Sequence, residues 1–190
     1  MILWLLLLSS NAYSLDKGKV HDEILTYTKE ILEASTFSEK AKKDFYGGVE
    51  RGIKSLLNKV GDKSLEESLL IISLKDLVKS SLLWRLSEGE VKAFIDGFGD
   101  LLLFGFSVEG AAEVTKRLIV REIGASVLDR MLKLLDVAIN KYGSDPSRIE
   151  SRLREKLSML LNKSKGELIR EVLELLRGEV EEAKSKAKRK

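Results

Sequence analysis

The chain of 190 residues has no cysteine, no glutamine, a single proline and a single histidine. The absence of cysteine excludes disulfide bonds, thiolate metal sites, a catalytic thiol and lipid attachment to an N-terminal cysteine. Because His21 is the only histidine, one chain cannot supply a metal site with several imidazole ligands. No nucleotide-binding loop, serine-hydrolase elbow or zinc-protease motif occurs either. We predict no metal, no cofactor and no catalytic residue, and we favour a function other than catalysis.

Few asparagines accompany the lack of glutamine, and charged residues make up 33% of the chain. Depletion of thermolabile residues together with enrichment in charge is the bias reported for thermophilic proteins. We interpret the source as a thermophile, although any charge-rich helical protein would show a similar composition.

The chain begins with an unbroken apolar run, Met1 to Leu8, followed by Ser-Ser-Asn-Ala-Tyr-Ser. The run is too short for a membrane-spanning helix, which needs about 20 apolar residues. It is typical of the hydrophobic region of a secretory signal peptide, although no lysine or arginine precedes it. Cleavage after Ser14 would leave Leu15 as the first residue, and cleavage after Ala12 would leave Tyr13. The alternative is that the run forms a helical turn of the core. We predict export to the periplasm or the cell exterior.

Helix-start signals recur along the rest of the chain. In a capping box, a Ser or Thr side chain accepts a hydrogen bond from the backbone three residues on, and a glutamate there reaches back. The pattern occurs at Thr36…Glu39, Ser64…Glu67, Ser87…Glu90, Ser147…Glu150 and Ser164…Glu167. Apolar residues with a helical period lie between these boxes, and no segment alternates as a strand would. The sequence therefore predicts an all-α protein, an antiparallel helical bundle of about seven helices in a single domain.

The predicted helices cover residues 16–34, 37–60, 65–86, 88–105, 108–142, 146–162 and 165–187. A helix over 108–142 would be long for a compact domain, so we expect a bend or break near Gly110 or Gly124. In the second helix, Gly48 and Gly52 lie on the apolar stripe. Glycine inside a helix costs up to about 1 kcal/mol relative to alanine, so we expect another helix to pack closely there.

Four of the six phenylalanines lie in the segment 94–106, together with three glycines. Phe94, Phe98, Phe104 and Phe106 could line an apolar pocket between helices. Aromatic residues at helical spacing more often belong to a packed core. Asp96 and Asp100 lie in the same segment, four residues apart. We predict that these two carboxylates lie on a solvated helix face rather than forming a catalytic pair.

The C-terminal tail carries five cations: Lys184, Lys186, Lys188, Arg189 and Lys190. The whole chain has a net charge of +3, so the rest of it carries −2. A basic tail on a slightly acidic body favours binding to an anionic surface, whereas nucleic acid is not an expected partner. The simpler interpretation is a solvated helix end, where cations complement the helix dipole.

These observations divide the chain into a signal peptide, residues 1–14, an all-helical domain, residues 15–183, and a basic tail, residues 184–190. We predict an exported, non-enzymatic binding or scaffolding protein whose partner is another envelope protein or an anionic surface. One alternative is a carrier of an apolar small molecule or lipid near Phe94–Phe106. Another is an enzyme whose site is assembled from dispersed carboxylates and lysines. No transmembrane span is expected, and the sequence does not indicate an oligomeric state.

Overall fold

The computed structural model describes residues 14–61, 63–159 and 162–189. The predicted signal peptide therefore lies outside the described residues, apart from Ser14. The described part of the chain contains eight α-helices, one π-helical turn and no strand, which confirms the all-α prediction. The elements are α1 (Lys17–Glu33), α2 (Glu39–Val60), α3 (Glu67–Leu83), α4 (Glu88–Leu103), α5 (Val108–Val120), α6 (Ala125–Asp136), η1 (Val137–Lys141), α7 (Pro146–Met159) and α8 (Lys165–Ala187).

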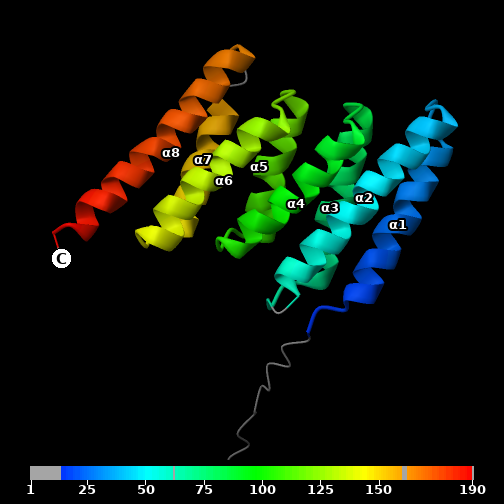
Figure 1. Ribbon diagram of the computed structural model, residues 1–190, viewed down its shortest axis with the longest axis horizontal. Coiled ribbons are helices and arrows are strands. Elements are labelled where there is room, and N and C mark those ends of the chain that lie inside the picture. The colour runs from blue at the N-terminus through cyan, green and yellow to red at the C-terminus, as the bar shows by residue number, and fades with distance from the viewer. Residues whose placement is uncertain (1–13, 62, 160–161, 190) are drawn as a thin grey trace, which may run out of the picture.

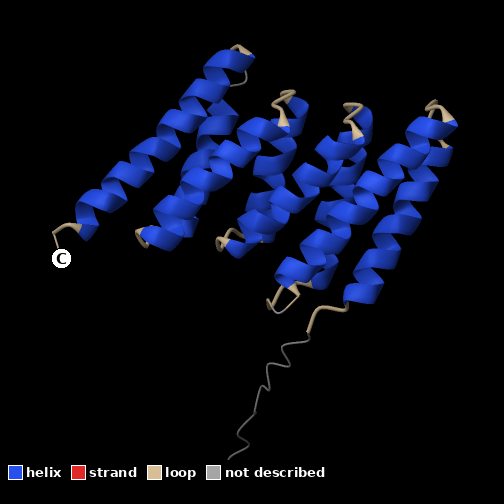
Figure 2. Cartoon of the chain, in the orientation of Figure 1, coloured by secondary structure: helices blue, strands red, loops and turns tan. Residues whose placement is uncertain are grey.

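The helices form an elongated array with two layers (Figure 1). Successive helices run antiparallel, and from α1 to α6 each helix also packs against the helix two places further along the chain. Helices α2, α4, α6 and α8 thus form one layer, and α1, α3, α5 and α7 form the other. Figure 2 shows the connecting loops gathered at the two edges of the array. The first and last helices lie at opposite ends of the molecule.

The segment 108–142 is divided by a break after Val120, close to the predicted position at Gly124. Glu122 adopts a left-handed conformation with φ of 53°, and Gly124 is the N-cap of α6. The Ile123 backbone N–H reaches back to the carbonyl of Leu118 at 2.9 Å, which satisfies a carbonyl at the helix end. Gly110, the other predicted position, lies inside the continuous helix α5.

Helices α2 and α4 make the most extensive helix–helix contact of the array, and glycines make it possible. A Cβ at Gly48 would lie 2.5 Å from the Glu88 carbonyl oxygen, and one at Gly52 would lie 2.9 Å from the Ile95 Cβ. Both distances are too short for a side chain, so the prediction of close helix packing at these glycines is confirmed. This contact belongs to a continuous apolar core that extends from Leu15 to Leu176.

Only some of the predicted capping boxes cap a helix. The boxes at Ser87 and Ser164 are present with both of their hydrogen bonds. The other three predictions are wrong. Helix α2 is capped by Ser38, and α3 begins after Glu66. Helix α7 begins at Pro146, so Ser147 lies inside its first turn.

Candidate functional site

The four phenylalanines of the predicted apolar pocket lie in the core. Phe94, Phe98 and Phe106 are buried, with exposed fractions of 1%, 0% and 4%, and Phe104 is partly buried against the same cluster. These rings do not line the hollows at the end of α8, at the α1–α2 turn, beside Trp84 or between α4 and α6. The ligand-binding role of the four residues remains a prediction.

Asp96 and Asp100 do not lie on a freely solvated face. The Lys59 ammonium on α2 lies between them, 2.8 Å from Asp96 and 2.7 Å from Asp100. Burial alone would raise the pKa of Asp96, but hydrogen bonds from Lys59 and Ser55 outweigh it and hold that pKa below its ordinary value. A general acid would need a raised pKa, so the geometry indicates a structural link between α2 and α4.

One hollow lies between the α6–α7 turn and the end of α8. Its volume is about 660 Å³, within the range of small-molecule sites. We call it the C-terminal hollow, and it is lined by Tyr142, Gly143, Ser144, Asp145, Arg148, Ala183, Lys186, Ala187 and Arg189. It includes two cations of the predicted basic tail, Lys186 and Arg189.

Local sequence determines the turn that forms one wall of this hollow. Helix α6 ends in the π-helical turn η1, and Gly143 follows with φ of 70°, a left-handed conformation that glycine adopts without steric cost. The Ser144 backbone N–H donates to the Ala138 carbonyl at 2.9 Å and closes the turn. Asp145 then accepts a hydrogen bond from the Ser147 backbone, and Pro146 begins α7. Proline suits the first helical position because its missing N–H would have no intrahelical partner.

Two glutamates of α8 form ion pairs with Arg148 and Lys186, two of the cations that line the hollow. The Arg148 guanidinium lies 2.6 Å from Glu179 and 2.9 Å from Glu182. Arg152 makes a second ion pair with Glu179, whose side chain is fully buried. Lys186 also bonds Glu182, at 2.6 Å. Hydrogen bonds from Lys186 and Arg148 lower the pKa of Glu182 to about 2, and the bond to Glu182 raises the pKa of Arg148.

Two polar groups of the C-terminal hollow remain without such partners. The Ser144 hydroxyl oxygen is buried and makes no hydrogen bond within the described part of the chain. The Arg189 side chain, in the last turn before the chain end, has no ion pair among the described residues. A buried polar atom without a partner is uncommon in a folded protein and requires an explanation.

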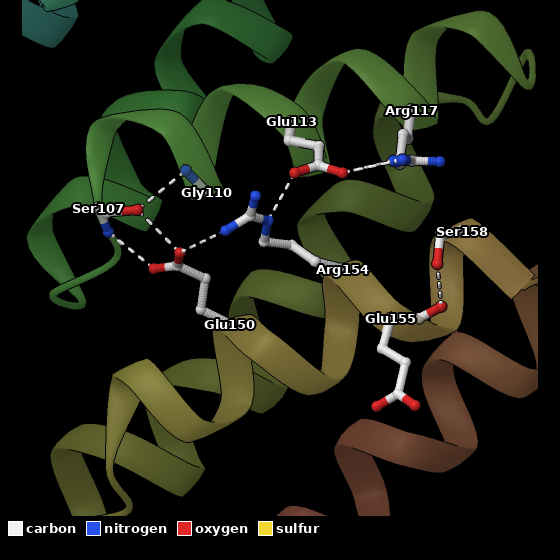
Figure 3. A network of polar contacts seen from close by, with 8 residues as sticks. All are labelled: Ser107, Gly110, Glu113, Arg117, Glu150, Arg154, Glu155 and Ser158. Atoms are coloured by element: carbon white, nitrogen blue, oxygen red, sulfur yellow. Dashed lines mark hydrogen bonds and ion pairs between the residues drawn. The ribbon is translucent and has the colours of Figure 1, made fainter.

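A second polar network holds the start of α7 in place (Figure 3). Glu150 accepts hydrogen bonds from the Ser107 backbone N–H at 2.7 Å and from the Ser107 hydroxyl at 2.8 Å. Arg154, one turn later, bonds Glu113 of α5 at 2.5 Å. These bonds join α7 to α5 and to the turn that precedes α5. They hold the start of α7, and with it Arg148, next to the C-terminal hollow.

Three smaller hollows lie elsewhere on the array. One, between the α1–α2 and α3–α4 turns, contains Phe37 with the Arg85 guanidinium 5.5 Å from its ring centroid. Another lies beside Trp84, and a third between α4 and α6 contains Asp96, Asp100 and Asp129. No group of three metal-ligating side chains occurs among the residues that the structure describes. None of these hollows combines several cations with an unpartnered buried group.

No protein-family model matches this sequence, and neither the curated proteins nor the solved structures yield a match to it.

Sequence reasoning found the tail cations but missed the other half of the hollow. Tyr142, Ser144 and Arg148 lie about 40 residues before the tail in the sequence, and no local pattern connects them to it. The Gly143-Ser144-Asp145-Pro146 segment indicated only a turn. An unsatisfied serine hydroxyl becomes visible only once the fold is known.

Proposed function

We propose that the protein is an exported, non-enzymatic binding or scaffolding protein that attaches to an anionic surface of the cell envelope through the end of α8. The observation that carries this proposal is that two cations of the tail are not neutralised by a neighbouring carboxylate. Lys188 and Arg189 have no ion pair among the described residues, and they extend from a body of net charge −2. Unneutralised cations at the end of an elongated molecule support attraction to anionic lipid or envelope polymer.

Two further features support export and scaffolding. Leu15 is the first buried side chain of the described chain, so cleavage after Ser14 would leave the packed body intact. Stacked helical layers also offer extended surfaces for partners. None of the described helices is long and apolar enough to cross a membrane.

The test compares the full chain with a chain that lacks residues 184–190, using sedimentation with neutral vesicles and with anionic vesicles. Near an anionic membrane each basic residue contributes about 1 kcal/mol, so five would support weak, reversible binding. We expect the full chain to bind anionic vesicles and to dissociate as salt rises to a few hundred millimolar, because salt screens the attraction. The truncated chain should remain folded by circular dichroism and should not bind. Equal binding by both chains would contradict the proposal.

A further inference from the structure

We propose that the C-terminal hollow binds a phosphate monoester, an inference that rests on the proposed attachment to anionic surfaces and specifies its chemistry. The hollow combines three cationic side chains with a buried hydroxyl that has no hydrogen-bond partner among the described residues.

The cations come from two helices that meet at the hollow. Arg148 lies in the first turn of α7, whereas Lys186 and Arg189 lie near the end of α8. Arg148 uses one nitrogen for Glu179 and another for Glu182, although a guanidinium carries five N–H donors. Lys186 bonds Glu182 and has three donors. The glutamates therefore hold both cations in place while donors remain for a ligand.

The Ser144 hydroxyl supplies the observation that points to a bound group. Ser144 lines the hollow, and its hydroxyl oxygen is buried and has no hydrogen-bond partner among the described residues, so a ligand would reach it after the side chain rotates toward the hollow. Leaving a buried donor unsatisfied is unfavourable, and a negatively charged acceptor would relieve it with a strong, charge-assisted bond. The hydroxyl and the three cations would each bind a negatively charged oxygen, so together they indicate an oxyanion as the ligand.

Charge and the apolar part of the lining favour a phosphate monoester over singly charged oxyanions. Asp145 also lines the hollow, where it accepts from the Ser147 backbone, and Glu182 partly neutralises Arg148 and Lys186. A weakly charged anion would gain little in such a mixed field. A phosphate monoester carries close to two negative charges at neutral pH and three strong acceptor oxygens. Its organic group could lie against Tyr142, Ala183 and Ala187, which line the rest of the hollow.

The same chemistry could come from a soluble sugar phosphate or from a lipid headgroup with a terminal phosphate. The experiment therefore has two arms with the full chain. Calorimetry measures binding of glycerol 3-phosphate, with inorganic phosphate as a second probe. Sedimentation compares vesicles that contain phosphatidic acid, a monoester, with vesicles that contain phosphatidylglycerol, a diester, at equal surface charge.

Three single variants test the site in both arms. Ser144→Ala removes the unpartnered hydroxyl, and Arg189→Gln removes the cation of the hollow that has no ion pair among the described residues. Lys188→Gln is the matched control, because it removes the same charge one residue away and does not line the hollow. We expect Ser144→Ala and Arg189→Gln each to weaken glycerol 3-phosphate binding about tenfold, as for loss of a charge-assisted hydrogen bond, and Lys188→Gln to leave it nearly unchanged. On vesicles, Lys188→Gln should weaken binding to the two lipids by the same factor, because it removes one tail charge.

Binding of glycerol 3-phosphate with this variant pattern would support a site for soluble monoesters. A preference for phosphatidic acid over phosphatidylglycerol that Ser144→Ala and Arg189→Gln abolish and Lys188→Gln preserves, without binding of glycerol 3-phosphate, would support a headgroup site. The inference is overturned if the two lipids bind equally, glycerol 3-phosphate does not bind, and Lys188→Gln and Arg189→Gln weaken vesicle binding by the same factor. That result would leave surface attachment by the tail intact. If the full chain binds no anionic vesicle at low salt, the proposed function itself fails, whatever the soluble arm shows.

Discussion

Helices α2 and α4 pack with their backbones close together, whereas α7 and α8 are joined by arginine and glutamate side chains. At Gly48 the backbone of α4 occupies the space that a Cβ would need. At the other end of the array, the buried carboxylate of Glu179 pairs with two arginines of α7. Both contacts join one helix of the array to another, but they use different interactions.

The difference predicts how each contact responds to change. Close apolar packing is sensitive to volume, because the core has no space for an added side chain. A buried ion pair is sensitive to the loss of either partner, because the remaining charge is left in a poor environment.

Replacing Arg148 and Arg152 together by Met should destabilise the fold most. Glu179 has an exposed fraction of 0%, so the double variant would leave a buried charge without its partners. Losing the partner of a buried charge costs about 3–5 kcal/mol. Chemical denaturation followed by circular dichroism measures the loss.

The matched control for this variant is Glu179→Leu. It leaves Arg148 and Arg152 with side-chain exposures of 38% and 49%, so both can be solvated. We expect a much smaller loss from this single change, and a partial rescue when it is added to the double arginine variant. If the loss in the combined variant equals the sum of the losses in the double arginine variant and in Glu179→Leu, the arginines and Glu179 are not coupled, and the prediction is contradicted.

At the α2–α4 contact, Gly52→Leu should cost about 1–3 kcal/mol of unfolding free energy, because the new side chain overpacks the core. Its control is Gly178→Leu in α8, where nothing lies within 4 Å of an added Cβ. There the better helix former should stabilise the protein by up to about 1 kcal/mol. Opposite signs of the two shifts in denaturant midpoint are expected. A stabilising Gly52→Leu would mean that α4 does not approach α2 at this glycine.

Gly110→Ala tests the link between α5 and α7. A Cβ at position 110 would lie 1.9 Å from a Glu150 carboxylate oxygen, so the carboxylate must leave the start of α5. The two hydrogen bonds from Ser107, the N-cap of α5, to Glu150 would be lost, and one such bond contributes about 1 kcal/mol. In a Glu150→Ala background the same glycine change should be neutral or stabilising, because no carboxylate remains to displace. Identical effects in both backgrounds, measured by a double-mutant cycle, would exclude this coupling.

The sequence predicted the features that depend on neighbouring residues. Helical periodicity indicated the all-α class, and the position of Gly52 on an apolar stripe indicated close packing. The capping box at Ser147 was predicted wrongly because α7 already begins at Pro146, and because Glu150 bonds Ser107, the N-cap of α5, which lies 43 residues earlier in the chain. Local pattern alone cannot distinguish a glutamate that bonds its own helix start from one that bonds another helix.

The candidate site was also predictable only where it depends on neighbouring residues. The tail cations were visible as a run of basic residues, whereas the hollow requires the α6–α7 turn to meet the end of α8. The partners of Asp96 and Asp100 could not be read from the sequence either, since Lys59 lies on a different helix. Contacts between segments distant in the chain determine which charges are neutralised, and the spacing of residues within one helix does not reveal them.

The smallest predicted effect concerns acid sensitivity at the α7–α8 end. Hydrogen bonds from Lys186 and Arg148 lower the pKa of Glu182 from 4.5 to about 2 in the folded protein. A lowered folded-state pKa stabilises the fold above the unfolded value near 4.5, and this contribution is lost as the pH falls from 4.5 toward 2. Glu182→Gln should therefore lower the denaturant midpoint at neutral pH, and its difference from the unmodified protein should shrink as the pH approaches 2.

Glu174→Gln, at an exposed glutamate of α8 without an ion pair among the described residues, should show no such pH-dependent difference. If both variants track the unmodified protein at every pH, the bonds to Glu182 do not stabilise this end of the array, and its stability must come from the buried pair at Glu179.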